Sequence, residues 1–270
     1  MRAPSLIAMD VDGTIAGVDH CLSERTVAVL SRFGNQAIMG VLVTGRSEKA
    51  TLAIASQCAF HAPQISCNGA LITQPDTGER LWIKQMSQTQ IEEAVEAART
   101  SKTTPVLWAA DQWFAEETNQ WTDLLTTLLD QAPTITDFES IIGNEEIIKV
   151  MIGGDPSVLN ACQLDQIESM ERSMPMFFEA SPTGASKAEA LRFLLDYLDI
   201  DPSLTWGFGD GGNDLGWLAL VGHAFAPENA CDSVRAIAEA IVGDNHHDGV
   251  VVFLDGVLGK DGIPWSGSVT

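Results

Sequence analysis

Short apolar runs, each closed by polar or glycine residues, constrain the fold of this chain more than any other feature. Four such runs occupy residues 5–10, 37–45, 63–72 and 204–210. Runs of this length are typical of strands in a parallel sheet that helices cover on both faces. They predict the central strands of one buried sheet.

Helical patterns separate these runs. Serines stand where three of the helices should begin, at Ser23, Ser47 and Ser186, and Ser186 with Glu189 matches a capping box. Alternating strands and helices predict an α/β fold with a doubly wound, Rossmann-like parallel sheet. Ligands of such sheets bind at the carboxyl ends of the strands, so the polar clusters there are the candidate site.

The middle of the chain follows another pattern. Helices are expected at 87–102, 121–130 and 157–170, and strands at 105–117 (broken at 110–111), 145–154 and 174–181. Paired strands with helices predict a small α+β domain built on an antiparallel sheet. The expected organisation is a core domain in residues 1–82 and 183–270, with an inserted cap domain in residues 83–182.

The charge balance limits the partners. The chain has 15 Lys and Arg against 37 Asp and Glu, a net charge of −22. Such a surface repels nucleic acid and anionic lipid, and no apolar stretch approaches the ~20 residues of a membrane helix. The five cysteines form no C-x-x-C pair and favour a reducing compartment. With no signal-peptide pattern at the N-terminus, these features predict a cytoplasmic protein without nucleic-acid or membrane partners.

The segment DVDGT at residues 10–14 carries the strongest chemical signal. Asp10 and Asp12 share one face of an extended strand, and a turn at Gly13 can aim both into a cleft. One carboxylate could attack a substrate or bind a metal while the other moves a proton. The alternative is an acidic turn that merely follows a strand.

A second acidic cluster, GDGGND at residues 209–214, ends the fourth apolar run. Asp210, Asn213 and Asp214 supply oxygen ligands without clustered Cys or His, which favours Mg²⁺ over zinc. The alternative is a glycine-rich loop in which these side chains cap a helix.

Positive charge and hydroxyl donors stand at two further positions. Thr44, Gly45 and Arg46 end the second apolar run, and Lys187 lies in the first turn of a predicted helix. A lysine there opposes the helix dipole, which indicates that it faces an anion, and a helix N-terminus itself favours phosphate. The alternative for Lys187 is a solvated surface charge.

The ordered set DVDGT, TGR, Lys187 and GDGGND resembles the haloacid dehalogenase superfamily. The segments PQISCNGALI and PTGASKAEAL are similar, more narrowly, to those of its Cof-type sugar-phosphate phosphatases. The resemblance covers nearly the whole chain, and the insert falls where that subfamily has its C2-type cap.

The resemblance implies a mechanism. Asp10 is the nucleophile that forms an aspartyl-phosphate, and Asp12 is the general acid and base. Mg²⁺ is held by Asp10, the backbone carbonyl of Asp12, and Asp210, with Asp214 lying behind the ligands. Thr44 and Lys187 bind the phosphoryl oxygens. The resemblance further places Gly45, Arg46, Asn68 and Asn213 at the substrate, although Asn68 with Gly69 is also a turn signal.

The expected function is that of a Mg²⁺-dependent phosphoric monoester hydrolase acting on a small phosphorylated metabolite, such as a sugar phosphate. Two alternatives remain open: a phosphomutase of the same superfamily, and a phospho-accepting binding or signalling module. Known phospho-accepting signalling modules are shorter than this chain, and a stable phosphoprotein has no use for a proton shuttle such as Asp12. The chain is expected to be a monomer or a small homo-oligomer.

Overall fold

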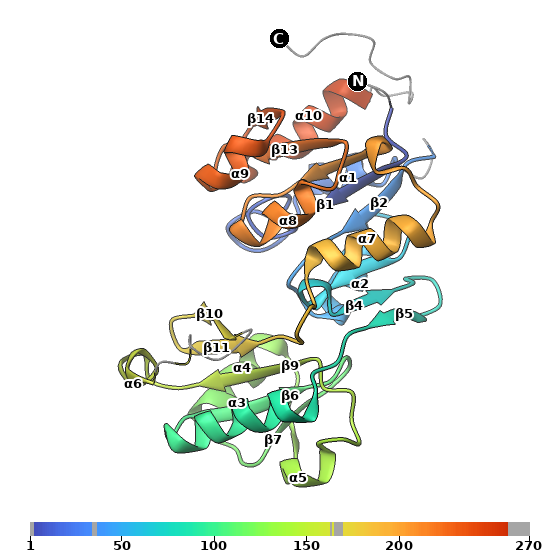
Figure 1. The fold of residues 1–270 in the computed structure, drawn as a ribbon. Coiled ribbons are helices and arrows are strands. Elements are labelled where there is room, and N and C mark those ends of the chain that lie inside the picture. The colour runs from blue at the N-terminus through green and yellow to red at the C-terminus, as the bar shows by residue number, and fades with distance from the viewer. Residues whose placement is uncertain (1–2, 34–36, 163, 165–169, 259–270) are drawn as a thin grey trace. The chain divides into compact units, whose positions relative to one another are not determined.

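The structure of the chain is a computed structural model that describes residues 3–33, 37–162, 164 and 170–258. Two compact units divide the chain: Met1–Trp82 with Ser186–Thr270, and Ile83–Ala185 (Figure 1). The first unit is therefore built from two separate stretches of sequence, and the second is inserted between them.

A five-stranded sheet in the order β14-β13-β12-β1-β2 is the centre of the first unit, and all its pairings are parallel. Its strands are β1 (Leu6–Met9), β2 (Met39–Leu42), β12 (Thr205–Phe208), β13 (His223–Pro227) and β14 (Ala240–Val242). The helices are α1 (Glu24–Leu30), α2 (Glu48–Gln57), α7 (Lys187–Tyr197), α8 (Leu215–Leu218), α9 (Asp232–Ile237) and α10 (Gly249–Leu258), with 3₁₀ turns η2 (Cys67–Gly69), η4 (Pro202–Leu204), η5 (Gly212–Asp214) and η6 (Asn245–His247).

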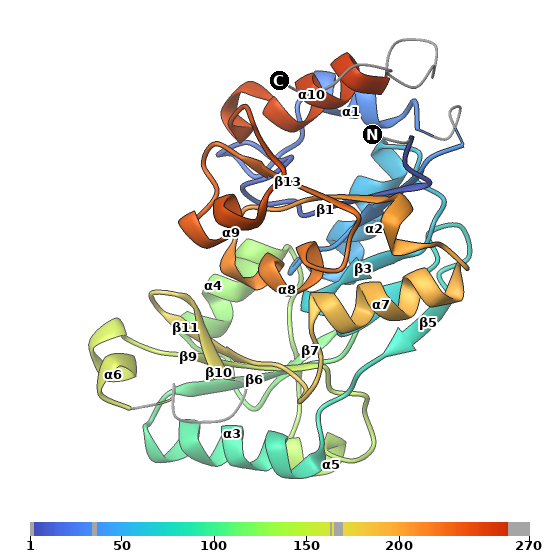
Figure 2. The same cartoon turned by 45° about the horizontal axis from the view of Figure 1, so that its top comes forward.

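Alternate residues of β1 pack against helices on opposite faces of this sheet. Ile7 and Met9 lie in a cluster with apolar residues of α1, α2 and α10, whereas Leu6 and Ala8 lie in a cluster with those of α7, α8 and α9. Figure 2 shows α1 beside α10. The sheet is thus covered on both faces, as predicted for a doubly wound α/β fold.

Three helices begin where the serines predict. The hydroxyl oxygen of Ser23, Ser47 and Ser186 each accepts a backbone hydrogen bond from the first turn of α1, α2 and α7. The Glu189 side chain pairs with Arg192 rather than closing the predicted capping box.

The prediction for residues 63–72 was wrong in detail. This segment forms two strands, β3 (Gln64–Ser66) and β4 (Leu71–Thr73), that pair antiparallel across η2. With β5 (Arg80–Ile83) they make a separate three-stranded sheet, and one parallel bridge joins Val43 to Ile65. The apolar run has the pattern of a single strand because both strands are buried, but the turn at Asn68 reverses the chain.

The second unit contains a six-stranded sheet in the order β10-β11-β9-β6-β7-β8. All pairings are antiparallel except that of β7 with β8. Its elements are α3 (Gln88–Thr100), β6 (Thr104–Trp108), β7 (Trp113–Ala115), α4 (Gln120–Leu129), β8 (Thr134–Ile135), α5 (Phe138–Ile141), β9 (Lys149–Gly153), α6 (Pro156–Ala161), β10 (Met170–Met174) and β11 (Phe177–Ala180).

Two apolar clusters hold this sheet, one beneath α3 and one that includes Leu125 of α4 and the fully buried Trp113. The expected helix at 157–170 is shorter, since α6 ends at Ala161 and residues 163 and 165–169 lie outside the described part. Strand β10 was not predicted. None of the helices in the described residues is long and apolar enough to cross a membrane.

Candidate active site

Asp10 follows directly on β1, which lies between β12 and β2 in the parallel sheet. Its backbone N–H donates to the Phe208 carbonyl over 2.8 Å, so the pairing with β12 continues past the end of the strand. The residue is only 6% exposed. A carboxylate buried this deeply needs a partner of opposite charge, which distinguishes it from an acidic surface turn.

The chain turns sharply after Asp10, and Gly13 makes this turn possible. Gly13 has a φ of +80°, and a Cβ at this position would lie 2.3 Å from Oδ2 of Asp210. The hydroxyl of the next residue, Thr14, donates to Oδ1 of Asp210 over 3.0 Å. The turn after β1 is therefore packed directly against the acidic loop after β12.

Substituting Gly13→Ala is expected to lower the free energy of unfolding by about 3 kcal/mol or more, because backbone strain of about 1–2 kcal/mol adds to the collision with Asp210. Gly78 is a matched control, since it has a φ of +73° but a Cβ at this position would meet nothing within 4 Å. Gly78→Ala should therefore lose only the unfolding free energy that the backbone strain costs. Urea unfolding of both variants measures the difference, and equal losses would show that the contact with Asp210 has no energetic role.

Asp214 is fully buried and holds the acidic loop together. Its Oδ2 accepts the backbone N–H groups of Asp210 over 3.1 Å and Gly211 over 2.9 Å, and its Oδ1 accepts the indole N–H of Trp217 over 2.9 Å. These bonds fix the loop that carries Asp210. Asn213, the preceding residue, is exposed in η5.

Lys187 joins the two acidic segments. Its Nζ donates to Oδ1 of Asp10 over 2.8 Å and to Oδ1 of Asp214 over 2.7 Å, and the residue is 3% exposed. Burial lowers the pKa of Lys187, but the two carboxylates outweigh burial and hold that pKa above its ordinary value. The lysine is therefore a charged group inside the site, and the solvated alternative does not describe it.

Asp10, Asp210 and Asp214 each offer a carboxylate oxygen, and these oxygens lie within 4.8 Å of one another. When all three carboxyls are ionised, Lys187 neutralises only one of the three negative charges, and the remaining two match a single divalent cation. Burial raises the pKa of Asp10 to about 7, and Asp214 and Asp210 add to the rise while Lys187 opposes it. Burial also raises the pKa of Asp210. An all-oxygen donor set with excess negative charge fits Mg²⁺.

Thr44 lies after β2 and is almost fully buried. Its Oγ1 accepts the Arg46 N–H over 3.1 Å, and its carbonyl accepts the Asn68 N–H over 3.0 Å. The Asn68 backbone is left-handed, and its buried Oδ1 has no hydrogen-bond partner among the described residues. Gly45 leaves room for this amide, because a Cβ there would lie 2.8 Å from that oxygen.

The turn that carries Asn68 also packs against the start of α7. A Cβ on Gly69 would lie 2.2 Å from the Ser186 carbonyl oxygen and 2.9 Å from the Lys187 nitrogen. The segment from Thr44 to Gly69 and the helix that presents Lys187 are thus neighbours, although more than a hundred residues separate them in the sequence.

Asp12 is engaged by two basic side chains. Arg46 donates to both of its oxygens, from Nε to Oδ2 over 2.8 Å and from Nη2 to Oδ1 over 2.7 Å, and Nδ1 of His20 lies 2.8 Å from Oδ1. Burial raises the pKa of Asp12, but the hydrogen bonds from Arg46 and His20 outweigh burial and hold it below its ordinary value. Asp12 is thus a carboxylate in this arrangement, and Arg46 contacts it rather than standing unpaired for a substrate.

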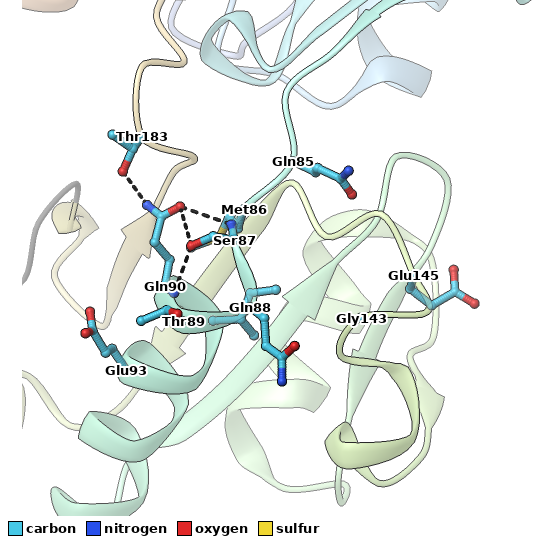
Figure 3. A pocket seen from close by; sticks show the side chains of 11 residues that line it. Gln85, Met86, Ser87, Gln88, Thr89, Gln90, Glu93, Gly143, Glu145 and Thr183 are labelled. Atoms are coloured by element: carbon cyan, nitrogen blue, oxygen red, sulfur yellow. Dashed lines mark hydrogen bonds between the residues drawn. The ribbon is translucent and has the colours of Figure 1, made fainter.

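A cavity of about 790 Å³ lies in the second unit, at the start of α3 (Figure 3). Gln90 spans one side of it, accepting from the Ser87 N–H and donating to the Thr183 hydroxyl. The charged side chains among its lining residues are Glu93 and Glu145. Because carboxylates repel phosphate, this cavity does not fit an anionic substrate, and none of the predicted site residues lines it.

Comparison with known proteins identifies the family of this chain. A sequence profile of the haloacid dehalogenase-like hydrolases matches residues 7–254. This chain belongs to that family. A crystal structure of a haloacid dehalogenase-like hydrolase from Bacteroides thetaiotaomicron superposes with a TM-score of 0.85 at 25% identity, covering 95% of this chain and 100% of the other.

Two named relatives of this haloacid dehalogenase-like hydrolase are phosphatases. The 5-amino-6-(5-phospho-D-ribitylamino)uracil phosphatase of Bacillus subtilis is 25% identical over 93% of this chain and 96% of its own length. The HMP-PP phosphatase of Klebsiella pneumoniae is 25% identical over 97% of this chain and 98% of its own length. The predicted family, fold class and enzyme class, a phosphatase of the haloacid dehalogenase type, are confirmed.

Three residues with no predicted role contact the predicted site of this hydrolase: Thr14 on Asp210, Trp217 on Asp214 and His20 on Asp12. Thr14 belongs to the DVDGT segment, and Trp217 lies one helical turn after Asp214, so both had a local signal. His20 had none, because its approach to Asp12 depends on the path of a loop.

Proposed function

We propose that this phosphatase is a Mg²⁺-dependent phosphohydrolase that acts on small phosphorylated metabolites through an aspartyl-phosphate on Asp10. One observation carries the proposal. The buried Asp10 carboxylate lies 2.8 Å from the Lys187 ammonium, and carboxylate oxygens of Asp10, Asp210 and Asp214 lie within 4.8 Å of one another. A nucleophile, a fixed cation and a set of oxygen ligands are the groups that phosphoryl transfer needs.

The proposed reaction has two steps. An oxygen of Asp10 forms a bond to phosphorus while the ester P–O bond breaks. Asp12, which takes up a proton from solvent before this step, gives that proton to the leaving oxygen. Water then attacks the phosphorus, Asp12 takes a proton from that water, and the bond to Asp10 breaks to release phosphate. Lys187 and the Thr44 hydroxyl bind phosphoryl oxygens throughout, and their burial keeps them fixed.

Asp10, the backbone carbonyl of Asp12, and Asp210 would hold the Mg²⁺, with Asp214 behind them. The cation supplies positive charge against the phosphoryl oxygens when it is bound. Asp214 orients this set from the protein side, because its Oδ2 accepts the N–H of Asp210 and its Oδ1 accepts Lys187. Gly45, Arg46, Asn68 and Asn213 remain candidates for contact with substrate.

The relatives named above act on two different phosphorylated compounds according to their names. These names support a small phosphorylated metabolite as the class of substrate, but they do not select one compound within that class. The sugar phosphates expected from the sequence remain one part of that class.

Phosphate release tests this function. The wild-type protein is assayed with p-nitrophenyl phosphate and a panel of sugar and nucleoside phosphates, in Mg²⁺ and in EDTA. We expect release in Mg²⁺ and at least a hundredfold loss in EDTA, restored by excess Mg²⁺. Undiminished release in EDTA would contradict metal dependence, and phosphate exchange between substrates without net release would favour a phosphomutase.

A further inference from the structure

His20 occupies a fixed position in an exposed loop that follows the DVDGT segment. Its backbone is left-handed, with a φ of +59°. The loop is closed by bonds from the His20 N–H to the Gly17 carbonyl and from the Gly17 N–H to the Cys21 carbonyl, both 3.0 Å. The imidazole itself is 76% exposed, so packing does not hold the ring.

The position of the ring is instead set by Asp12. Nδ1 of His20 lies 2.8 Å from Oδ1 of Asp12, the one hydrogen bond that its ring makes in the part of the chain described. A carboxylate can only accept, so the Nδ1–H of His20 donates while Asp12 is ionised. Oδ1 of Asp12 can still accept this bond when the proton that Asp12 donates is carried on Oδ2. His20 thus adds a second basic side chain to the one that already binds Asp12.

Arg46 closes the arrangement into a ring of contacts. Its Nη2 donates both to Oδ1 of Asp12 over 2.7 Å and to the carbonyl oxygen of His20 over 2.8 Å. The guanidinium therefore holds the carboxylate and also the backbone that carries the imidazole. Asp12 receives donors from the loop on one side and from the segment after β2 on the other.

The contacts of Asp12 matter more for the orientation of its side chain than for the stability of the fold. The Asp12 side chain is 43% exposed and that of His20 is 76% exposed, and ion pairs open to water stabilise a fold little. A proton donor, in contrast, must lie within hydrogen-bond reach of the atom it protonates. Without His20, Arg46 would hold the half-exposed Asp12 from one side only, and the carboxyl group would meet that requirement less of the time.

We propose that His20 is a positioning residue that fixes the orientation of Asp12 for protonation of the leaving-group oxygen. The proposal rests on the function proposed above, in which Asp12 is the general acid. It predicts that the effect of His20 depends on the leaving group. An alkyl alcohol needs a proton as it departs, whereas p-nitrophenolate departs without one.

The variants separate the side chain from the backbone. His20→Gly keeps the left-handed backbone and removes the donor, because glycine adopts positive φ freely. His20→Asn keeps a donor near the Nδ1 position, and asparagine also tolerates positive φ. His61→Gly is the control, since His61 is another exposed histidine paired with an aspartate, Asp76, over 3.0 Å.

The measured quantity is kcat/KM in Mg²⁺ for glycerol 2-phosphate and for p-nitrophenyl phosphate, because kcat/KM covers the steps up to departure of the leaving group. We expect His20→Gly to lower kcat/KM about tenfold for the alkyl ester, at least five times more than for the aryl ester. The fall should lie in kcat rather than KM. His20→Asn should recover most of the loss, and His61→Gly should match the wild type.

Equal losses for both esters, or the same loss in His20→Asn as in His20→Gly, would overturn the positioning role. Asp12→Asn distinguishes this failure from failure of the proposed function. If Asp12→Asn shows the leaving-group dependence and His20→Gly does not, the positioning role alone is wrong. If Asp12→Asn itself discriminates between the esters by less than twofold, Asp12 is not the acid, and both proposals fail.

Discussion

Asp10→Asn is expected to abolish phosphate release, with a loss in kcat of more than about ten-thousandfold, because an amide oxygen is a poor nucleophile toward phosphorus. The fold should survive. Lys187 keeps its 2.7 Å bond to Asp214, and the variant removes one of the negative charges that the buried cluster carries in excess. In EDTA the midpoint of thermal unfolding should therefore equal or exceed that of the wild type.

Asp76→Asn is the matched control for this variant. Asp76 makes the same type of charge-assisted contact, with His61 over 3.0 Å, but its side chain is 54% exposed. It should retain wild-type activity. Full activity in purified Asp10→Asn would remove Asp10 from the reaction, and a large fall in its unfolding temperature would show that the carboxylate contributes to stability rather than opposing it.

The core of the fold could be predicted because its local signals agree with its tertiary structure. The apolar runs before Asp10, Gly45 and Asp210 became adjacent parallel strands, and Ser23, Ser47 and Ser186 begin helices by accepting backbone bonds. Each signal depends on a few neighbouring residues and on burial from both sides. Such signals need no knowledge of distant contacts.

The error at residues 63–72 and the missed β10 have a common origin, because in both places the pattern of apolar residues does not show the structure that forms. Asn68 reverses the chain in a left-handed turn, a conformation that the apolar pattern on either side does not reveal. Four of the five residues of β10 are exposed, so it has little apolar periodicity, and it is recognised as a strand only through its pairing with β11.

The difference between local sequence signals and contacts made by the completed fold applies to the site as well. That Asp10, Asp210 and Lys187 belong together followed from strand ends and from a family pattern. The bonds that set their roles did not follow: Lys187 between Asp10 and Asp214, and Arg46 on Asp12. These contacts join residues 27 to 177 positions apart, and their formation depends on the completed fold.

Lys187→Met is expected to have the second large effect, and its effect on stability should exceed that of any surface substitution. The variant leaves three carboxylates within 4.8 Å without their cation. Breaking a buried ion pair in this way costs about 3–5 kcal/mol of unfolding free energy. Activity should fall about 10²–10³-fold, because a fixed positive charge at the phosphoryl group is lost.

Lys149→Met is the control for this loss. Lys149 pairs with Glu179 over 3.2 Å and lies 4.8 Å from the centre of the Trp108 ring, but both charged side chains are about one-fifth exposed. Its removal should therefore cost less than that of Lys187, about 1–2 kcal/mol. Combining Lys187→Met with Asp214→Asn should recover much of the stability without recovering activity, because it removes charge from the cluster without returning the cation. Adding Mg²⁺ to Lys187→Met should also raise its unfolding temperature more than that of the wild type. If Lys187→Met costs no more than Lys149→Met in EDTA, the carboxylates are not held together by this lysine, and the electrostatic account of the site is wrong.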